Sequence, residues 1–184
     1  MRKQQKIGFG CTPKINEMKR ILSSVIILAF ATIFANAQIP QHLLGLRFGT
    51  GDGFGTEISY QHGLTSVNRV ELDLGFSSDH VNYMGSRYNS TSWALTGLYH
   101  WVHRLDTNLN WYLGPGAKLG SWSYDAGYNY SYNNGIFLAA AGDVGVEYTF
   151  PLGIQLALNA RPEIGLINHG TEINVGFSVR YQFK

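Results

Sequence analysis

Beyond residue 37 this sequence has no cysteine, little charge and no helical periodicity. The single cysteine, Cys11, lies in the first segment, so residues 38–184 cannot form a disulfide bond. Charged residues make up 14% of the chain, against roughly 25% in soluble domains. The missing 3.6-residue period excludes a helical bundle for residues 38–184, and the low charge argues against an ordinary soluble domain.

The one long apolar run, Ile21–Phe34, has the features of an export signal. Two basic residues precede it, and the small-x-small sequence Ala35-Asn36-Ala37 follows it. We predict translation from Met18 and cleavage after Ala37, so that 1–37 is leader and signal peptide. The alternative is a transmembrane anchor, but the run is short for a span of about 20 residues.

The basic character of the chain belongs to this leader. Residues 1–37 hold six of the 14 Lys and Arg and one of the 12 Asp and Glu, which leaves 8 basic and 11 acidic residues and a formal charge of −3. A nucleic-acid partner is therefore not expected. The remaining 147 residues, 38–184, have the length of one domain.

Residues 38–184 alternate between apolar and polar side chains, as extended strands with two unlike surroundings do. In one segment Leu72 and Leu74 alternate with Glu71, Asp73 and Gly75. Clusters of Gly, Asn and Asp separate the segments and predict turns. The predicted strands are 42–50, 55–64, 68–77, 91–102, 109–122, 136–150, 153–163 and 171–183.

The connections between these strands predict an up-and-down order with unlike ends. Those at 64–68, 103–108 and 151–153 are short, whereas 77–91 and 124–135 are longer and rich in Tyr, Asn and Ser. Outer-membrane barrels combine tight periplasmic turns with longer outer loops in this way. We therefore predict an all-β fold, an eight-stranded antiparallel up-and-down transmembrane β-barrel.

Alternation alone does not say which face meets lipid, because a soluble lipocalin-like barrel has the same period with its apolar face inside. The polar face here is rich in glycine, which makes room for long charged side chains in a narrow interior. Aromatic residues also cluster near the predicted strand ends, among them Trp93, Trp101 and Trp111, as they do at membrane–water boundaries. Both observations favour apolar residues outside.

The inward-facing positions predict an ion-pair network, because buried charges are tolerated only when paired. Arg47 and Glu57 are equally distant from Asp52 and should face each other across the first hairpin. We expect a polar plug and not a proton or cation path, since eight strands leave no aqueous pore. The predicted network comprises Arg47, Glu57, Glu71, Asp73, Lys118, Asp143, Glu147, Arg161, Glu163 and Arg180.

The last strand carries the most specific motif. It follows the pattern polar, any, glycine, any two, hydrophobic, any, hydrophobic, and it matches at Asn174, Gly176, Val179 and Tyr181, followed by Phe183. With this motif the chain resembles the OmpX-like proteins and the membrane domain of OmpA-like proteins, within the broad outer membrane protein beta-barrel domain group. The resemblance implies a monomer in the bacterial outer membrane, in contact with lipid and lipopolysaccharide and recognised by the barrel-assembly machinery.

No enzymatic activity is expected, and no cofactor or metal. The sequence has no phosphate loop, CxxC, HExxH or GxSxG, and His42, His62, His100 and His103 lack metal-ligand spacing. The alternative is a lipid A-modifying acyltransferase or deacylase. Its candidates are Asp79 and His80 in one loop, and His169, Thr171 and Glu172 in another, with Ser77 or Ser92 within reach on barrel closure.

The segment 124–134 suggests surface binding. It combines Tyr124, Tyr128, Tyr130 and Tyr132 with Asn and Ser, a composition that suits contacts with an extracellular glycan or protein. An aromatic collar at the level of the lipopolysaccharide is the other interpretation. Trp122 has the opposite parity from Trp111, which predicts either a bulge near Pro115-Gly116 that shifts the register or a position outside the lipid zone. Pro162 lies within the predicted strand 153–163 and suggests a bulge or an early end to the ladder.

Overall fold

The computed structural model describes residues 39–50, 54–83, 86–125 and 134–183, with the backbone only at 79–83, 86–89, 124, 125 and 134. The predicted leader 1–37, with its start at Met18 and its cleavage after Ala37, lies outside the described residues. Among the residues described, no helix is long and apolar enough to cross a membrane.

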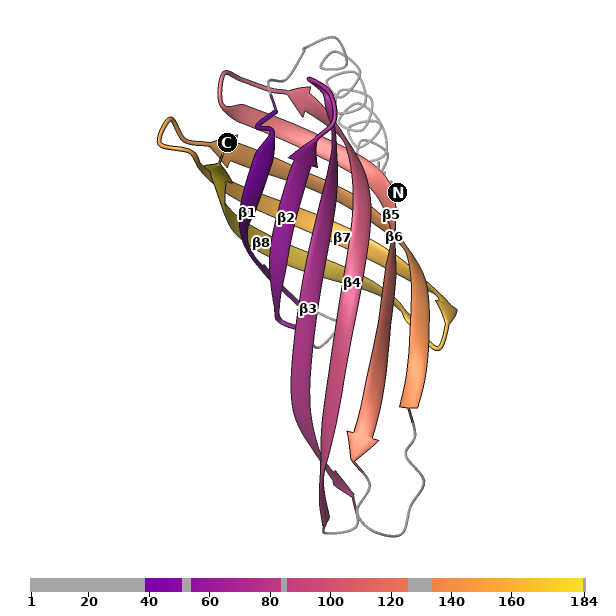
Figure 1. Cartoon of the computed structure of the whole chain (residues 1–184). Helices are drawn as coiled ribbons and strands as arrows, with labels where there is room; N and C mark the ends of the chain where they lie inside the picture. Colours follow the sequence, from indigo (N-terminus) through magenta and orange to yellow (C-terminus); the bar gives the residue numbers. More distant parts are fainter. Residues whose placement is uncertain (1–38, 51–53, 84–85, 126–133, 184) are drawn as a thin grey trace, which may run out of the picture. The chain divides into compact units, whose positions relative to one another are not determined.

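Across the described residues, eight antiparallel strands form one closed barrel in chain order (Figure 1). β1 pairs with β8 as well as with β2, and His42 lies opposite Phe183, so the two ends of the barrel chain meet at the same rim. The strands are β1 (His42–Gly49), β2 (Thr56–Gly63), β3 (Asn68–Tyr83), β4 (Ser86–Arg104), β5 (Leu109–Asp125), β6 (Asn134–Thr149), β7 (Ile154–Ile167) and β8 (Thr171–Phe183).

The barrel has its apolar side chains outside and its charged side chains inside. Leu72, Leu158 and Val175 are exposed on the outer face, while Arg161 and Arg180 are buried in the interior. A soluble protein could not expose so continuous an apolar surface to water. The predicted eight-stranded barrel is therefore confirmed, and its outer surface is one that lipid, and not water, must cover.

Aromatic side chains surround the barrel near both ends of its apolar surface. Trp101 and Tyr148 are exposed near the rim that carries the chain ends, and each contacts the aromatic ring of a residue two positions away in the sequence. Phe76 and Trp93 lie opposite each other on β3 and β4, nearer the other rim. These two levels correspond to the membrane–water boundaries. We call the rim with His42 and Phe183 the periplasmic rim and the opposite one the outer rim.

The strands near the outer rim are longer than predicted. The segment 77–91 was expected to be a loop, but β3 and β4 stay paired from Ser77–Ser92 to Tyr83–Ser86. β7 likewise continues to Ile167. The long connection expected at 77–91 is therefore wrong, and the predicted strand 153–163 ends too early. These outer parts lack the apolar–polar alternation in the sequence, while the backbone ladder continues. Figure 1 shows β3 and β4 reaching far beyond β1 and β2.

Neither proline shifts the register, and Trp122 points inward. The β4–β5 ladder is interrupted opposite Pro115 and resumes with the same offset, as expected for a residue without an N–H. Pro162 still pairs with Ile173, so the bulge or early strand end expected there is wrong. The shift in β6–β7 pairing lies instead at Leu138 and Ala139. Trp122 packs beside Phe137 in the interior, consistent with a place outside the lipid zone.

We predict that Leu158→Arg destabilises the folded barrel by about 2–4 kcal/mol, because a guanidinium would replace an apolar side chain near mid-strand on the lipid face. Urea unfolding in lipid vesicles, followed by tryptophan fluorescence, measures this change. The matched control is Leu152→Arg in the β6–β7 turn, which is also exposed and should change the stability little. Equal effects of the two substitutions would contradict a lipid-facing Leu158.

Candidate functional site

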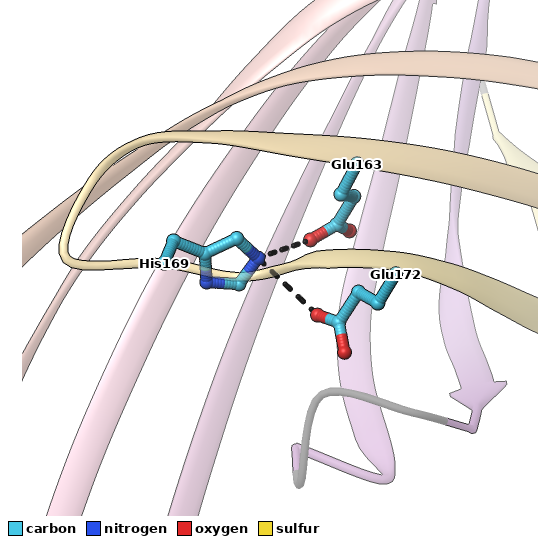
Figure 2. Close-up of side chains that lie close together, drawn as sticks. All are labelled: Glu163, His169 and Glu172. Atoms are coloured by element: carbon cyan, nitrogen blue, oxygen red, sulfur yellow. Dashed lines mark hydrogen bonds and ion pairs between the residues drawn. The ribbon is translucent and has the colours of Figure 1, made fainter.

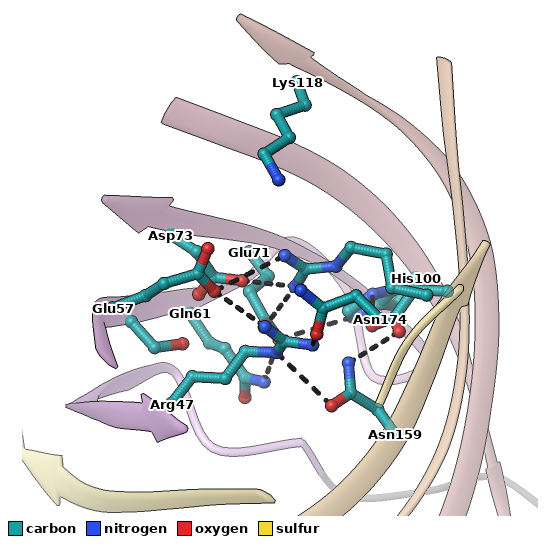
Figure 3. A network of polar contacts seen from close by, with 12 residues as sticks. Arg47, Glu57, Gln61, Glu71, Asp73, His100, Lys118, Asn159 and Asn174 are labelled. Atoms are coloured by element: carbon teal, nitrogen blue, oxygen red, sulfur yellow. Dashed lines mark hydrogen bonds and ion pairs between the residues drawn. The ribbon is translucent and has the colours of Figure 1, made fainter. Parts of the chain in front are cut away.

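Arg47 illustrates how the interior network is built. The β1–β2 register places it directly opposite Glu57, as expected from the sequence. Its guanidinium donates hydrogen bonds to Glu57 Oε2 at 2.8 Å and to Asn174 Oδ1 at 2.8 Å, and reaches Asn159 Oδ1 at 3.3 Å. A Cβ at Gly176 would collide with this guanidinium. The inward glycine thus makes the space that the long side chain occupies. Figure 3 shows Arg47 with its partners Asn159 and Asn174.

Two further arginines cross the middle of the barrel. Arg161 on β7 makes a short ion pair with Asp73 on β3 and lies 3.6 Å from Glu57 Oε2. Arg180 on β8 donates to Glu71 Oε1 at 2.7 Å and to Ser59 Oγ at 2.8 Å. All these side chains are shielded from solvent. Each guanidinium therefore joins strands from opposite walls, which hydrogen bonds within the sheet cannot do.

A third group lies nearer the periplasmic rim. Arg69 Nη1 is 2.7 Å from Glu147 Oε2, and its guanidinium lies 4.6 Å from the ring centre of Tyr112. His100 Nε2 is 3.1 Å from Asp143 Oδ2, while its Nδ1 accepts a hydrogen bond from Arg69 Nε at 3.3 Å. One imidazole thus bridges a carboxylate and an arginine in the same layer.

The fourth group lies nearer the outer rim. Lys118 Nζ is 3.0 Å from Glu163 Oε2, and His169 Nε2 is 3.2 Å from both that oxygen and Glu172 Oε1. In Figure 3, Lys118 stands apart from the central arginines.

Apolar side chains bound this network at both ends. Phe54, Ala94 and Phe137 form a buried cluster on the outer side, with Trp122 packed against it. Val102 and Tyr112 form a second cluster toward the periplasmic rim, with Ile39 beside it. A polar cavity of about 480 Å³ opens at that rim, lined in part by Arg104, Asn110 and Gln182. The charged layers thus lie between two apolar ones.

The structure brings all ten predicted network residues into the interior. It adds further charged or ionisable groups that the predicted network did not include. Arg69, His100 and Glu172 also face inward. Arg69 has the same parity as Glu71 and Asp73, which predicts that its side chain faces inward. It lies at the strand end, however, where few neighbouring residues remain to establish the apolar–polar alternation. His100 follows a run of Ala94, Thr96 and Leu98 that does not read as a polar face.

Carboxylates outnumber basic side chains in the described interior. Arg47, Arg69, Lys118, Arg161 and Arg180 are five bases, against the seven acids Glu57, Glu71, Asp73, Asp143, Glu147, Glu163 and Glu172. The ten predicted residues comprise four bases and six acids, so the excess of two carboxylates persists with the full set. Two histidines face this excess: His100 lies near Asp143 and Glu71, and His169 lies near Glu163 and Glu172.

The comparisons with known proteins agree with this architecture. No protein-family model and no curated protein matches the sequence. Among solved structures, Ail, the attachment invasion locus protein of Yersinia pestis, matches with a TM-score of 0.52 at 10% identity, over 77% of this chain and 96% of that one. The N-terminal β-barrel domain of Pseudomonas aeruginosa OprF matches with a TM-score of 0.53 at 18% identity, over 78% and 98%. The chain has the fold of the small eight-stranded outer-membrane β-barrels.

Of the other predicted sites of this outer-membrane barrel, the C-terminal motif lies on both faces of β8. Along β8, Asn174 and Gly176 face the interior, whereas Val179, Tyr181 and Phe183 face lipid. The side chains of Tyr124, Tyr128, Tyr130 and Tyr132 lie outside the described residues, so surface binding by this segment stays a prediction.

His169, one of the two histidines considered for catalysis, has no triad around it among the described residues. His169 contacts Glu163 and Glu172 through one nitrogen and stacks on Phe137 at 5.3 Å. A catalytic histidine must instead lie between an acid and a hydroxyl nucleophile. The side chains of Asp79 and His80 lie outside the described residues.

We predict that Arg161→Met destabilises the outer-membrane barrel by about 3–5 kcal/mol, because Asp73 is left as a buried charge without its main partner. Adding Asp73→Asn should restore part of that loss by removing the unpaired charge. Urea unfolding in lipid vesicles measures both variants. Arg104→Met is the control, since Arg104 reaches only exposed carbonyl groups of its own turn. An effect of Arg161→Met no larger than the control's would contradict the pairing.

Proposed function

We propose that the protein is a non-catalytic outer-membrane barrel with a plugged interior, which acts at the cell surface. The observation that carries the proposal is that interior charged and polar contacts link side chains from all of the strands. Arg47 and Glu57 supply β1 and β2, Asp73 and His100 supply β3 and β4, and Lys118 supplies β5. Asp143, Arg161 and Arg180 complete the set from β6, β7 and β8.

The plug follows from the energetics of these contacts. An ion that entered the lumen would have to break several buried pairs at once, and breaking a buried pair costs about 3–5 kcal/mol. The apolar clusters around Phe137 and Val102 add a second barrier at each end. A barrel filled in this way suits a mechanical or surface-presenting role better than transport.

The first test of the plug is electrical. Purified barrel in planar lipid bilayers should give no steady conductance steps, because no water column crosses the charged layers. The double variant Phe54→Ala/Phe137→Ala removes the outer apolar cluster and should remain closed, since the ion pairs below it are intact. Regular porin-like steps from the unmodified protein would overturn the plugged interior.

A non-catalytic role is supported by the surroundings of His169. Its recorded partners are two carboxylates and an aromatic ring, which offers acid on both sides and no nucleophile. The alternative of a lipid A-modifying enzyme would need a hydroxyl group in hydrogen-bond contact with that ring. Such an enzyme would also change the mass of lipid A in cells that express it.

Surface binding is proposed for the segment 124–134, which runs from the end of β5 to the start of β6. It contains Asp125 and no Lys or Arg, so its chemistry suits an uncharged glycan or a protein. The structural neighbour Ail is known in complex with the heparin analogue sucrose octasulfate. A polysulfated ligand needs basic partners, which this segment does not supply, and we therefore expect a different ligand class here.

The test uses cells that display the barrel and an array of uncharged oligosaccharides. Replacing Tyr124, Tyr128, Tyr130 and Tyr132 with alanine should lower binding about tenfold or more, because exposed tyrosines are frequent binding anchors. Tyr148→Ala, near the periplasmic rim, is the matched control and should bind normally. Sucrose octasulfate should not compete. Equal binding by the four-residue variant would refute the role of this segment.

The last strand is proposed to serve folding in the cell as well as packing. Val179, Tyr181 and Phe183 present an apolar stripe to lipid. Because these residues match the C-terminal motif, we propose that the barrel-assembly machinery recognises this stripe. Gly176 has a packing role of its own against Arg47. We also propose a monomer in contact with outer-membrane lipid and lipopolysaccharide, since closure leaves no free strand edge for a second copy.

A further inference from the structure

The hairpin between β7 and β8 brings three potential metal ligands together near the outer rim. Glu163 on β7 lies directly opposite Glu172 on β8 in the strand register. Asn168 adopts a left-handed conformation, with φ of 47°, which asparagine tolerates at a turn. This turn carries His169 back toward the barrel, where its ring lies between the two carboxylates (Figure 2).

Two carboxylates directly opposite each other on neighbouring strands repel, so the pair needs a cation. Among the described contacts, Lys118 serves Glu163, at 3.0 and 3.3 Å. His169 Nε2 is 3.2 Å from Glu163 Oε2 and 3.2 Å from Glu172 Oε1. One ring nitrogen carries at most one proton and cannot fully serve both oxygens. Glu172 Oε1 is indeed shielded and accepts no hydrogen bond within the described part of the chain.

These distances match those between neighbouring ligands of one metal ion. Zn²⁺ bound tetrahedrally at about 2.0–2.1 Å from each donor holds adjacent donors about 3.3 Å apart. The ring nitrogen is 3.2 Å from each carboxylate oxygen, and the three donor atoms all lie within 4.8 Å of one another. A small closure of Glu172, whose side chain is 25% exposed, would complete the three-ligand geometry.

The surroundings hold the ligands while leaving the site open. Glu163 is fully buried, and His169 is stacked on Phe137 with an angle of 17° between the rings, which fixes the imidazole plane. The side chain of His169 is 14% exposed, so an ion can enter from the outer rim. An ion on Glu163 Oε2 leaves the other oxygen to Lys118, so the existing ion pair need not break.

We propose that Glu163, His169 and Glu172 form a binding site for a divalent transition-metal ion of the Zn²⁺ type, with a fourth position facing the cell exterior. Imidazole with two carboxylates suits Zn²⁺ better than Mg²⁺ or Ca²⁺, which prefer oxygen ligands alone. The expectation of no metal came from His42, His62, His100 and His103, and none of these contributes here. The site shares Glu163 with the proposed plug, but Zn²⁺ binding here requires neither a closed lumen nor the tyrosine-rich segment.

Calorimetric titration of the folded barrel in detergent with Zn²⁺, and with Mg²⁺ in parallel, tests the proposal. The unmodified protein should bind one Zn²⁺ saturably and show no comparable heat with Mg²⁺. His169→Ala and Glu172→Gln should each weaken Zn²⁺ binding about tenfold or more. Folding of each variant is checked by its shift on unboiled gels, and both positions are partly exposed, so the barrel should tolerate them.

Two control proteins locate the ion. His103→Ala removes a histidine that stacks on Trp111 near the periplasmic rim, and it should bind as the unmodified protein does. His42→Ala/His62→Ala removes the histidine pair whose Nδ1 atoms lie 3.3 Å apart, and it should also keep full binding. Loss of Zn²⁺ binding in this double variant, unchanged binding in His169→Ala, or no saturable binding by the unmodified protein would each overturn the site.

Discussion

The pairing of buried charges inside a narrow barrel is the constraint on which the rest of this structure depends. A barrel that turns its apolar face toward lipid must place its polar residues in a lumen too small for bulk water. Every long charged side chain there needs a partner on another strand, as Arg161 has in Asp73 and Arg180 in Glu71. Inward glycines such as Gly176 make this possible, because a side chain in their place would collide with a guanidinium.

This constraint links the fold to the proposed role. A lumen occupied by cross-strand ion pairs holds the walls together and leaves the outer end of the barrel as the place where the protein can meet other molecules. We propose two chemically different kinds of binding for that end. The segment around Tyr128 and Tyr130 is aromatic and free of basic residues, whereas the β7–β8 hairpin concentrates Glu163, His169 and Glu172.

The interior charge balance explains why the hairpin differs from the rest of the lumen. In the centre, the Arg161 guanidinium lies near three carboxylates. Arg47 and Arg180 each pair with one carboxylate and also donate to uncharged side chains. Near the outer rim Lys118 is the basic residue that reaches Glu163, and Glu172 adds a further negative charge. His100 and His169 both approach carboxylates of the interior. His100 is shielded from solvent, whereas His169 is partly exposed near the outer rim.

Much of this could be predicted from the sequence, because a period of two residues records which face each side chain meets. The alternation placed Leu72 outside and Glu71 inside, and the spacing around Asp52 placed Arg47 opposite Glu57. The outer parts of β3 and β4 lack this alternation in the sequence, so their pairing could not be predicted from it. Contacts between distant strands also leave no local pattern. Only barrel closure decided that Arg161 meets Asp73, and only the β7–β8 register and the turn at Asn168 set His169 between two glutamates.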